Sequence, residues 1–357
     1  MPTGLEAIGF DAWHREQADP ARLAAGEIAR VIAAYRERYV VSNGATDVTA
    51  EVTGKLMYGA ESPLDFPAVG DWVGVQYFDA GASAIIDVLL PRKTTLKRKT
   101  PGKQIDYQLI AGNIDTGLIV QSLDADYSLR RLERYLVMIN DSDIQPLVLL
   151  SKSDLISPAE IAERVAAIRN LMPDVPVLAF SNKDNPGMEA VQALLDSQQT
   201  YCMLGSSGVG KTTLLNNLLG REQYATRTIR EKDGKGRHTT TSRQLIRLPN
   251  GALMIDTPGM RELGNIAVEA GIDETFGEIV SLADQCRFSD CSHTQEHGCA
   301  VLAALAAGGI ARERYASYMK LARESAFHEM SFLEKKQKDR QFGKMVRTVM
   351  KHKTSRR

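Results

Sequence analysis

The chain has 357 residues, of which 43% are hydrophobic and 25% charged, and its formal net charge is zero. These values are ordinary for a soluble globular protein of two or three domains. The sequence has no apolar run long enough to span a membrane and no basic-then-apolar leader, which excludes both a membrane-anchored and a secreted protein of the usual kinds. We therefore expect a cytoplasmic protein without a membrane partner.

Beyond a distinctive first 25 residues, the chain has several short segments rich in β-branched and aromatic residues. They are Val31–Val41, Thr46–Met57, Asp71–Phe78 and Ala82–Leu90. Four or five such strands in about 65 residues are typical of a small closed barrel, and barrels of this kind often bind RNA. A barrel without a ligand stays open, because Tyr39, Tyr58, Trp72 and Tyr77 can be core residues as well as base-stacking residues.

Three apolar segments further along alternate with helical patterns and predict a mostly parallel sheet covered by helices on both faces. The predicted strands are Asp115–Leu123, Gln145–Leu150 and Val175–Phe180. One helix has a clear start, with Ser157 as N-cap, Pro158 at the first helical position and Glu160 closing a capping box.

The segment after the second of these strands, Ser151 to Asp154, is a candidate base-reading loop. The Lys152 stem can cover the face of a base, and the Asp154 carboxylate can accept hydrogen bonds from guanine N1 and N2, a donor pair that adenine lacks. Ser151 stands where this motif usually has Asn, and it can make fewer hydrogen bonds. Ser181 and Asn182 follow the next strand, where a backbone N–H can meet guanine O6. An ordinary solvated turn at this place stays open.

The strongest signal is Gly205-Ser-Ser-Gly-Val-Gly-Lys-Thr212, which lies between a predicted strand, Thr200–Leu204, and a predicted helix, Thr213–Leu219. This context predicts a P-loop. Its glycines let backbone N–H groups close around the β-phosphate, Lys211 reaches the β and γ oxygens, and the Thr212 hydroxyl ligates Mg²⁺.

A second buried strand, Gly251–Asp256, leads into Asp256-Thr-Pro-Gly259. We expect Asp256 in the outer shell of the metal and the Gly259 N–H on the γ-phosphate. The nucleotide-binding residues predicted by these motifs are Ser151, Lys152, Ser153, Asp154, Ser181, Asn182, Gly205, Ser206, Ser207, Gly208, Val209, Gly210, Lys211, Thr212, Thr213, Asp256 and Gly259.

Gly236–Thr241 is a candidate switch that follows a polar stretch. Thr240 is the threonine expected to join Thr212 on Mg²⁺. Many small GTPases orient the attacking water with a Gln directly after the DxxG glycine, but Met260 stands there. We therefore assign water orientation to His238, beside Lys211 as the second catalytic residue, because a neutral imidazole can hydrogen-bond water. A solvated loop with an unrelated histidine stays open.

The cysteines Cys286, Cys291 and Cys299 and the histidine His293 lie within 14 residues and form a closed Cys3His set suited to a structural Zn²⁺. Unrelated reduced thiols, or His297 in place of His293, are the alternatives. Cys202 precedes the P-loop and is most simply a buried core thiol.

Helical patterns follow at Ala300–Ala307 and from Ala311 to about Lys338. Although the net charge is zero, residues 334–357 have ten Lys or Arg against two acids, and residues 91–103 have six against none. Such stretches suit nucleic-acid phosphates, and a solvated tail without a partner is the alternative.

The base-reading loop comes before the P-loop, the reverse of the usual GTPase order, and this order predicts a circularly permuted domain. Together with the switch and the cysteine cluster, it resembles the RsgA (YjeQ) family of circularly permuted GTPases, which assist late maturation of the small ribosomal subunit. The resemblance extends from about Gly26 to about Glu324, and departs at Ser151 and in the first 25 residues. It implies an OB-fold, the same four zinc ligands, and GTP hydrolysis with Mg²⁺ coupled to binding and release of the subunit and its rRNA.

We therefore expect a multidomain protein with an OB-like β-barrel, a permuted α/β P-loop GTPase and a zinc-binding helical domain. The predicted parts are an N-terminal extension (1–25), the RNA-binding barrel (26–100), the GTPase domain (101–270), the zinc domain (271–338) and a basic tail (339–357). A monomer is expected. Two other classes stay open: a P-loop ATPase or kinase, and an RNA-binding protein that uses GTP as a structural ligand.

Overall fold

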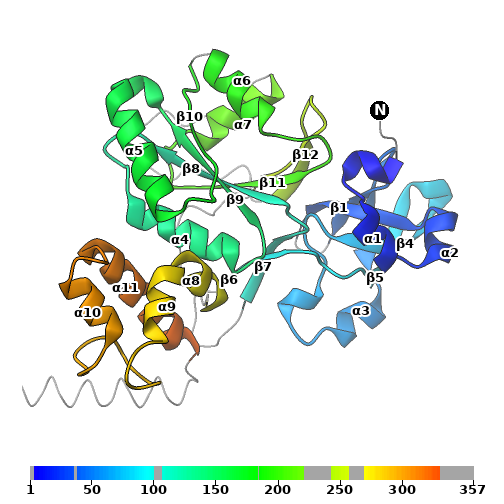
Figure 1. Cartoon of the computed structure of the whole chain (residues 1–357). Helices are drawn as coiled ribbons and strands as arrows, with labels where there is room; N and C mark the ends of the chain where they lie inside the picture. The colour runs from blue at the N-terminus through cyan, green and yellow to red at the C-terminus, as the bar shows by residue number, and fades with distance from the viewer. Residues whose placement is uncertain are drawn as a thin grey trace, which may run out of the picture. The chain divides into compact units, whose positions relative to one another are not determined.

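The structure is a computed structural model that describes residues 4–35, 38–99, 107–183, 185–220, 243–256 and 269–329. The chain divides into two compact units (Figure 1). The first consists of residues 1–97 and 108–263, and the second of residues 98–107 and 264–357. The predicted switch at Gly236–Thr241, the Gly259 turn and the basic tail lie outside the described residues.

The N-terminal extension folds as short helices, which the sequence analysis did not predict. They are η1 (Gly4–Ile8), α1 (Ala12–Gln17) and α2 (Pro20–Ala25). Asp11 and Asp19 cap the two α-helices with their carboxylates. Phe10, in the turn before α1, packs edge-on against Trp72 with ring centroids 4.7 Å apart. The extension is therefore part of the folded core and not a loose arm.

Five strands close into a small barrel, as the sequence predicts. They are β1 (Ile28–Ala34), β2 (Tyr39–Ser42), β3 (Asp47–Val52), β4 (Trp72–Phe78) and β5 (Ser83–Leu89). Their neighbour order is β1-β2-β3-β5-β4, and β4 returns to pair with β1. β3 and β5 are parallel and the other barrel pairs antiparallel, the arrangement expected of an OB-like barrel. Alternating inward residues, mostly Val, Ala and Ile, fill the core.

Two predicted strand boundaries in the barrel were wrong. Val31–Val41 is two strands, β1 and β2, paired as a hairpin with Val31 opposite Val41. Thr46–Met57 ends as helix α3 (Gly54–Gly59), because the Thr53 hydroxyl caps it by accepting from the Leu56 N–H at 3.2 Å. Short 3-10 helices, η2 (Pro63–Asp65) and η3 (Asp79–Gly81), lie before and after β4.

The barrel aromatics take different places. Trp72 is fully buried, so it belongs to the core, whereas Tyr58 on α3 is 89% exposed. Tyr39 and Tyr77 are partly buried against the barrel core.

A mostly parallel set of strands continues from the barrel. Its strands are β8 (Thr116–Ser122), β9 (Gln145–Ser151), β10 (Val177–Ala179), β11 (Thr200–Leu204), β12 (Arg243–Arg247) and β13 (Leu253–Asp256). In the order β10-β9-β8-β11-β13-β12 all neighbours are parallel except the last pair. β12, which was not predicted, also pairs with β1 and thus joins the two sheets.

Helices cover both faces of this sheet, as predicted (Figure 1). α4 (Leu129–Asn140) and α5 (Pro158–Leu171) lie on one side, and α6 (Asn185–Ala193) and α7 (Lys211–Leu219) on the other. The predicted capping box is present at the start of α5. A separate two-stranded sheet consists of β6 (Thr95–Lys99) and β7 (Tyr107–Gly112).

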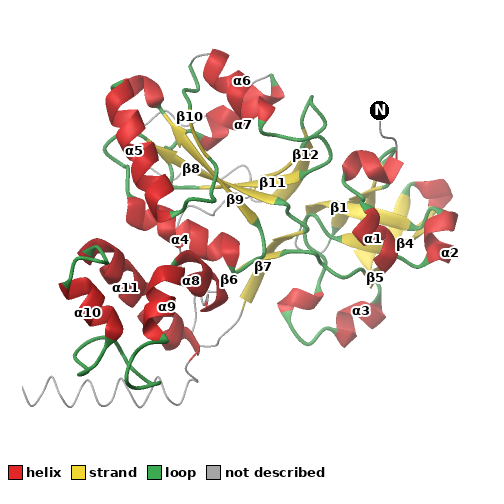
Figure 2. Cartoon of the chain, in the orientation of Figure 1, coloured by secondary structure: helices red, strands yellow, loops and turns green. Residues whose placement is uncertain are grey.

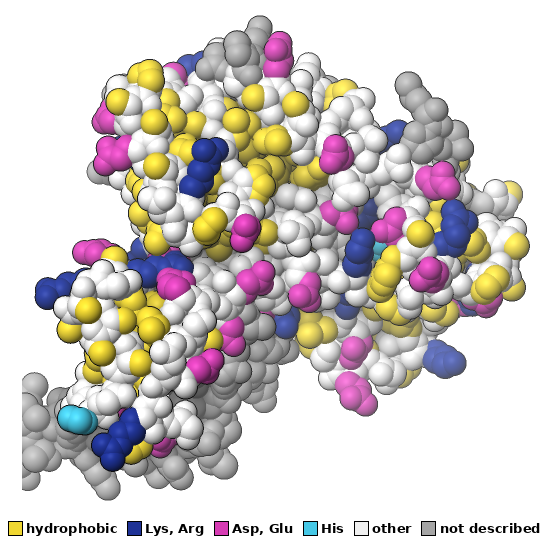
Figure 3. All heavy atoms as spheres, in the orientation of Figure 1, with side chains coloured by type: hydrophobic (Ala, Val, Ile, Leu, Met, Phe, Trp, Pro, Cys, Tyr) yellow, Lys and Arg dark blue, Asp and Glu magenta, His cyan; other side chains and the backbone are white. Residues whose placement is uncertain are grey.

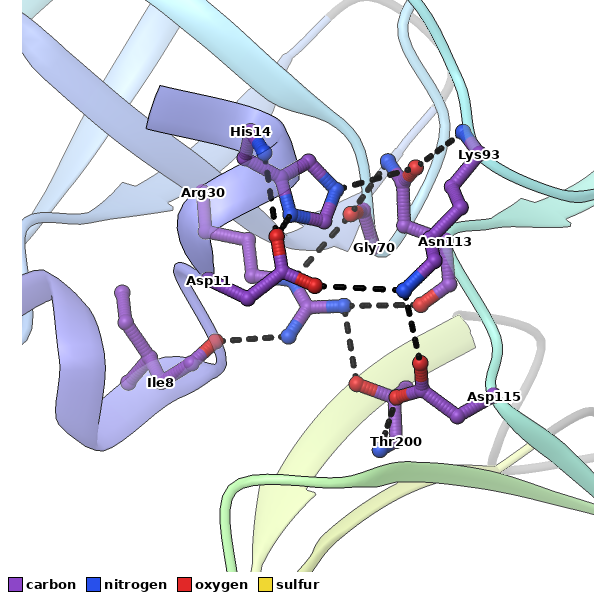
Figure 4. Close-up of polar contacts among 9 residues, drawn as sticks. All are labelled: Ile8, Asp11, His14, Arg30, Gly70, Lys93, Asn113, Asp115 and Thr200. Carbon is purple, nitrogen blue, oxygen red and sulfur yellow. Dashed lines mark hydrogen bonds and ion pairs between the residues drawn. The ribbon is translucent and has the colours of Figure 1, made fainter. Parts of the chain in front are cut away.

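A buried arginine joins the extension, the barrel and the mostly parallel sheet (Figure 4). Arg30 on β1 donates to the carbonyls of Ile8 (2.6 Å), Gly70 (3.1 Å) and Asn113 (3.0 Å), and to the Thr200 hydroxyl at 3.0 Å. Burial lowers the Arg30 pKa to about 10, so the side chain stays charged at neutral pH. Thr200 begins β11, the strand that ends at the P-loop, so this hub fixes that strand relative to the barrel.

The second unit is helical among its residues from 269 to 329 (Figure 2). Its helices are α8 (Glu269–Thr275), α9 (Gly277–Ala283), α10 (Ala300–Ala306) and α11 (Arg312–Glu329). Arg314 of α11 stacks over the Phe276 ring and pairs with Glu278 at 2.7 Å. The two helices predicted here are confirmed as far as the described residues go, up to residue 329.

Acidic and basic side chains are interspersed on the molecular face shown in Figure 3. Among the described helices, none is both long and apolar enough to cross a membrane.

Candidate nucleotide site and metal centre

The predicted P-loop is a turn from β11 into α7, and its backbone requires glycine. Gly205, Gly208 and Gly210 have φ angles of 145°, 83° and 95°, which residues with a side chain rarely adopt. A Cβ on Gly205 would also lie 2.2 Å from the Val120 carbonyl oxygen. Ser207 and Gly208 are exposed at the tip of the turn, whereas Val209 is buried in the core below.

Lys211, the first residue of α7, folds back over this turn. Its ammonium donates to the carbonyls of Gly205 at 2.5 Å and Ser206 at 2.6 Å. Thr212 and Thr213 follow on the same helical turn and are half-buried. Backbone N–H groups and an ammonium at a helix start are donors that suit an anion.

The P-loop is supported from α4 by Arg131, which the sequence analysis missed. Arg131 Nη1 donates to the Ser206 hydroxyl at 2.5 Å and also pairs with both Asp126 carboxylate oxygens. The contact joins residues 75 positions apart, so no local sequence signal could have found it.

Ser151 ties the predicted base-reading loop to the P-loop. Its hydroxyl, which is fully buried, donates to the Val209 carbonyl at 2.6 Å. A serine at the place usually held by Asn thus still makes the connection between the two loops. Because its side chain is buried, Ser151 stabilises the loop and does not contact a ligand directly.

Lys152 is held by a carboxylate that the sequence analysis also missed. Lys152 lies in the left-handed region at φ 60°, and its Nζ donates to Asp124 Oδ2 at 2.7 Å. Burial raises the Asp124 pKa, but Lys152, the Ser122 hydroxyl and the Asp126 N–H outweigh it and bring the pKa to about 2. The pair fixes the lysine stem beside the loop.

Asp154 and the second predicted base-reading segment lie together. The Asp154 carboxylate accepts from Lys183 Nζ at 2.8 Å and from the Ser181 hydroxyl at 2.8 Å. These two donors, Lys183 first, hold the Asp154 pKa below its ordinary value, so the group is a carboxylate at neutral pH. Ser153 is anchored through its backbone N–H to the Phe180 carbonyl at 3.1 Å.

The sheet order brings these segments to one edge. β9, β8, β11 and β13 are consecutive neighbours, and in parallel strands the carboxyl ends meet at the same edge, where nucleotides bind in open α/β sheets. Asp256 is the last residue of β13, beside the P-loop strand. Gly259, His238 and Thr240 lie outside the described residues.

The candidate metal centre lies between α9 and α10 in the second unit. The ligand atoms of Cys286, Cys291, His293 and Cys299 all lie within 4.8 Å of one another. The Cys286 and Cys299 sulfurs are 3.8 Å apart, and His293 Nδ1 is 3.6 Å and 3.5 Å from them. In a tetrahedral site with bonds of about 2.3 Å to sulfur and about 2.0–2.1 Å to nitrogen, two sulfurs lie about 3.8 Å apart, and a sulfur and the nitrogen lie about 3.6 Å apart. The residues therefore fit a tetrahedral metal ion.

Backbone and side-chain contacts hold this set in place. The N–H groups of Ala300 and Leu302 donate to the Cys286 and Cys299 sulfurs at 3.3 and 3.4 Å. The Tyr315 hydroxyl of α11 donates to the His293 carbonyl at 2.6 Å. The alternative ligand His297 is not part of this cluster.

Comparison with known proteins agrees with this geometry. A profile of the RsgA GTPase family matches residues 89–266. The small ribosomal subunit biogenesis GTPase RsgA 2 of Lactiplantibacillus plantarum is 45% identical over 329 residues, or 92% of each chain.

Solved structures give the same result. YjeQ from Thermotoga maritima superposes with a TM-score of 0.61 at 25% identity, over 84% of this chain and 98% of that one. YloQ, a circularly permuted GTPase, superposes with a TM-score of 0.60 at 23% identity, over 85% and 96% of the chains, and so shares the fold. Because this chain is 45% identical to the Lactiplantibacillus plantarum protein over 92% of each chain, and because the family profile matches it, it belongs to the RsgA GTPase family.

Proposed function

We propose that this protein is a GTPase that binds the small ribosomal subunit, hydrolyses GTP there and is released on hydrolysis, as a step in late subunit maturation. The observation that carries the proposal is the joining of the Ser151–Asp154 loop to the P-loop through Ser151 and Val209, in a chain closely similar to a small ribosomal subunit biogenesis GTPase. The proposal needs one copy of the chain, in the cytoplasm where ribosomes are assembled.

Each nucleotide part has a place in this proposal. We assign the phosphates to residues 205–213, with Lys211 binding the β and γ oxygens. Arg131 stabilises the turn through its hydrogen bond to the Ser206 hydroxyl. The guanine lies against the Lys152 stem, with its N1 and N2 donors on Asp154. Displacing Lys183 from that carboxylate exchanges one charge-assisted hydrogen bond for two from the base.

The phosphates also need a divalent cation, which Thr212 and Thr240 would hold, with Asp256 in its outer shell. Mg²⁺ supplies neutralisation of the charge that develops between the phosphates during transfer. Among the described residues, half-buried Thr212, directly after Lys211, is the one best placed to bind this cation through its hydroxyl.

We assign orientation of the attacking water to His238, because Met260 cannot do it. His238→Ala should leave GTP affinity unchanged and lower the rate of hydrolysis on the subunit at least about tenfold. Full turnover by this variant would transfer the role to another residue or to the ribosome.

For the metal centre we propose Zn²⁺, since three sulfurs and an imidazole nitrogen at tetrahedral spacing are the donor set of structural zinc sites. All four positions are taken by protein, so the metal would stabilise the fold and not act in hydrolysis. We propose that the barrel, this helical unit and the two basic stretches contact rRNA, largely through its phosphates.

The nucleotide state should control subunit binding. In sequence, the segment that we assign to sensing the γ-phosphate comes before residue 264, where the chain passes from the first unit into the second. A γ-phosphate that orders this segment would therefore bias the unit that we assign to rRNA.

Cosedimentation tests this proposal. The protein is mixed with purified small or large subunits and either GDP or a non-hydrolysable GTP analogue, at fixed salt because phosphate contacts are salt-dependent. We expect binding to small subunits, stronger with the analogue than with GDP. Equal affinity in the two nucleotide states, or equal binding to both subunits, would contradict the proposal.

A further inference from the structure

Asn182, in the second base-reading segment, is held from two sides by the phosphate-binding half of the site. Its Nδ2 donates to the Gly210 carbonyl at 3.3 Å, immediately before α7 begins. Its own backbone carbonyl accepts from Asn217 Nδ2, on α7, at 3.0 Å. Asn217 stands six residues after the P-loop lysine, and nothing in the sequence motifs singled it out.

The neighbours of Asn182 narrow the choice of donor for guanine O6. The Lys183 N–H already donates a hydrogen bond to the Ser181 hydroxyl at 3.1 Å, and that hydroxyl in turn donates to the Asp154 carboxylate. The next backbone donor in the segment is the Asn182 N–H, and we assign it to O6. A single backbone N–H reads an oxygen only if its residue is held in a fixed position.

The two base-reading loops are tied to consecutive P-loop carbonyls. Ser151 donates to Val209, and Asn182 donates to Gly210. The Asp154 side of the base and the O6 side therefore have separate anchors. Loss of one anchor should affect the reading of one edge of the base and spare the other.

From these contacts we propose that Asn217 is a positioning residue for recognition of guanine O6, acting through the Asn182 carbonyl. The inference rests on the proposed guanine site. Removing the Asn217 amide leaves the carbonyl of Asn182 without this donor. The peptide between Asn182 and Lys183 can then turn, and its turning shifts the Cα of Asn182, to which the N–H group is joined. The Asn182 N–H then no longer points at a fixed place.

The test uses base analogues that probe the two edges separately. The affinities of GTP, 6-thio-GTP and ITP are measured for the full-length protein and for Asn217→Asp, which keeps the size of the side chain but removes its donor. 6-thio-GTP replaces O6 by sulfur, a weaker acceptor, and ITP lacks the 2-amino group that Asp154 would bind. We expect the ratio of the GTP affinity to the 6-thio-GTP affinity to fall about fivefold in the variant. The ratio of the GTP affinity to the ITP affinity should stay the same.

Asn217→Ala serves as a second variant with the same expected pattern, and a retained preference for GTP over ITP shows that the site has folded. Asn250→Ala is the matched control, because Asn250 also donates to a carbonyl, that of Leu195 at 2.8 Å, but does so in the turn before β13. This control should keep both preferences.

Retention of both preferences in the Asn217 variants would overturn the inference. Equal loss of both would also overturn it, because it would mean a general loosening of the site. A wild-type protein without any preference for GTP over either analogue would instead remove the proposed base site itself, and the inference with it.

Discussion

The Ser151 hydroxyl lies 2.6 Å from the Val209 carbonyl oxygen and joins the base-reading loop to the P-loop across 58 positions of sequence. Both atoms are buried, since Ser151 is fully buried and Val209 lies in the core. The contact makes base binding and phosphate binding depend on one geometry, although the permutation places the two loops in reversed order along the chain.

Ser151→Ala should therefore weaken GTP and GDP binding about fivefold, because the Val209 carbonyl loses a buried hydrogen bond of ~1 kcal/mol. Affinity is measured by displacement of a fluorescent nucleotide. Ser157→Ala is the control, since it removes the N-cap of α5 at a similar cost in stability without touching the site. A Ser151 variant that binds both nucleotides as tightly as the control would show that the tie has no effect on binding.

Asp154→Asn should weaken GTP and relatively favour xanthosine triphosphate, whose C2 carbonyl accepts where guanine donates an amine. The amide of the variant can donate to that carbonyl, whereas the carboxylate cannot. Competition between the two nucleotides measures the exchange. Unchanged GTP affinity in this variant would remove Asp154 from the base site.

The Asp124–Lys152 pair predicts a pH dependence. The folded-state pKa of Asp124 is lowered from 3.8 to about 2, so the unfolded state takes up the proton first. The stabilisation is fully present above pH 3.8 and is lost as the pH falls through about 2. The difference in unfolding free energy between wild type and Asp124→Asn, measured by urea titration, should shrink over this interval. A difference that stays constant from pH 5 to pH 2 would show that the ion pair is not its source.

Cys286→Ala should abolish stoichiometric zinc and loosen the segment between α9 and α10, while the nucleotide site, which has its own core, still binds GDP. Cys202→Ala is the matched control. Burial raises the Cys202 pKa to about 12, so its thiol is neutral, and its loss should leave the metal content unchanged. Metal analysis of protein purified under reducing, chelator-free conditions decides the point. Absence of zinc from the wild type would contradict the assignment.

Local signals allowed much of the fold to be predicted. The capping box of Ser157 and Glu160 depends on residues three positions apart, and the glycines of the P-loop reflect the backbone of their own turn. The cysteine cluster lies within one short loop. In each case the residues that interact are close in sequence, so their spacing carries the information.

Features that depend on distant partners could not be predicted. Arg131 contacts Ser206 across 75 positions, and Arg30 reaches Thr200 across 170, so neither arginine differs in sequence from a surface residue. β12 was missed because it has only five residues, and the two apolar ones are neighbours instead of alternating with polar residues. The end of β3 was misread because Thr53, a β-branched residue that favours strands, acts here as a helix cap.

The most direct test of the whole account is the rate of GTP hydrolysis by the full-length protein alone, with purified small subunits, and with purified large subunits. We predict slow turnover alone, strong stimulation by small subunits, and no stimulation by large ones. Hydrolysis that is unaffected by small subunits, or stimulated equally by both, would contradict the claim that this GTPase acts on the small subunit.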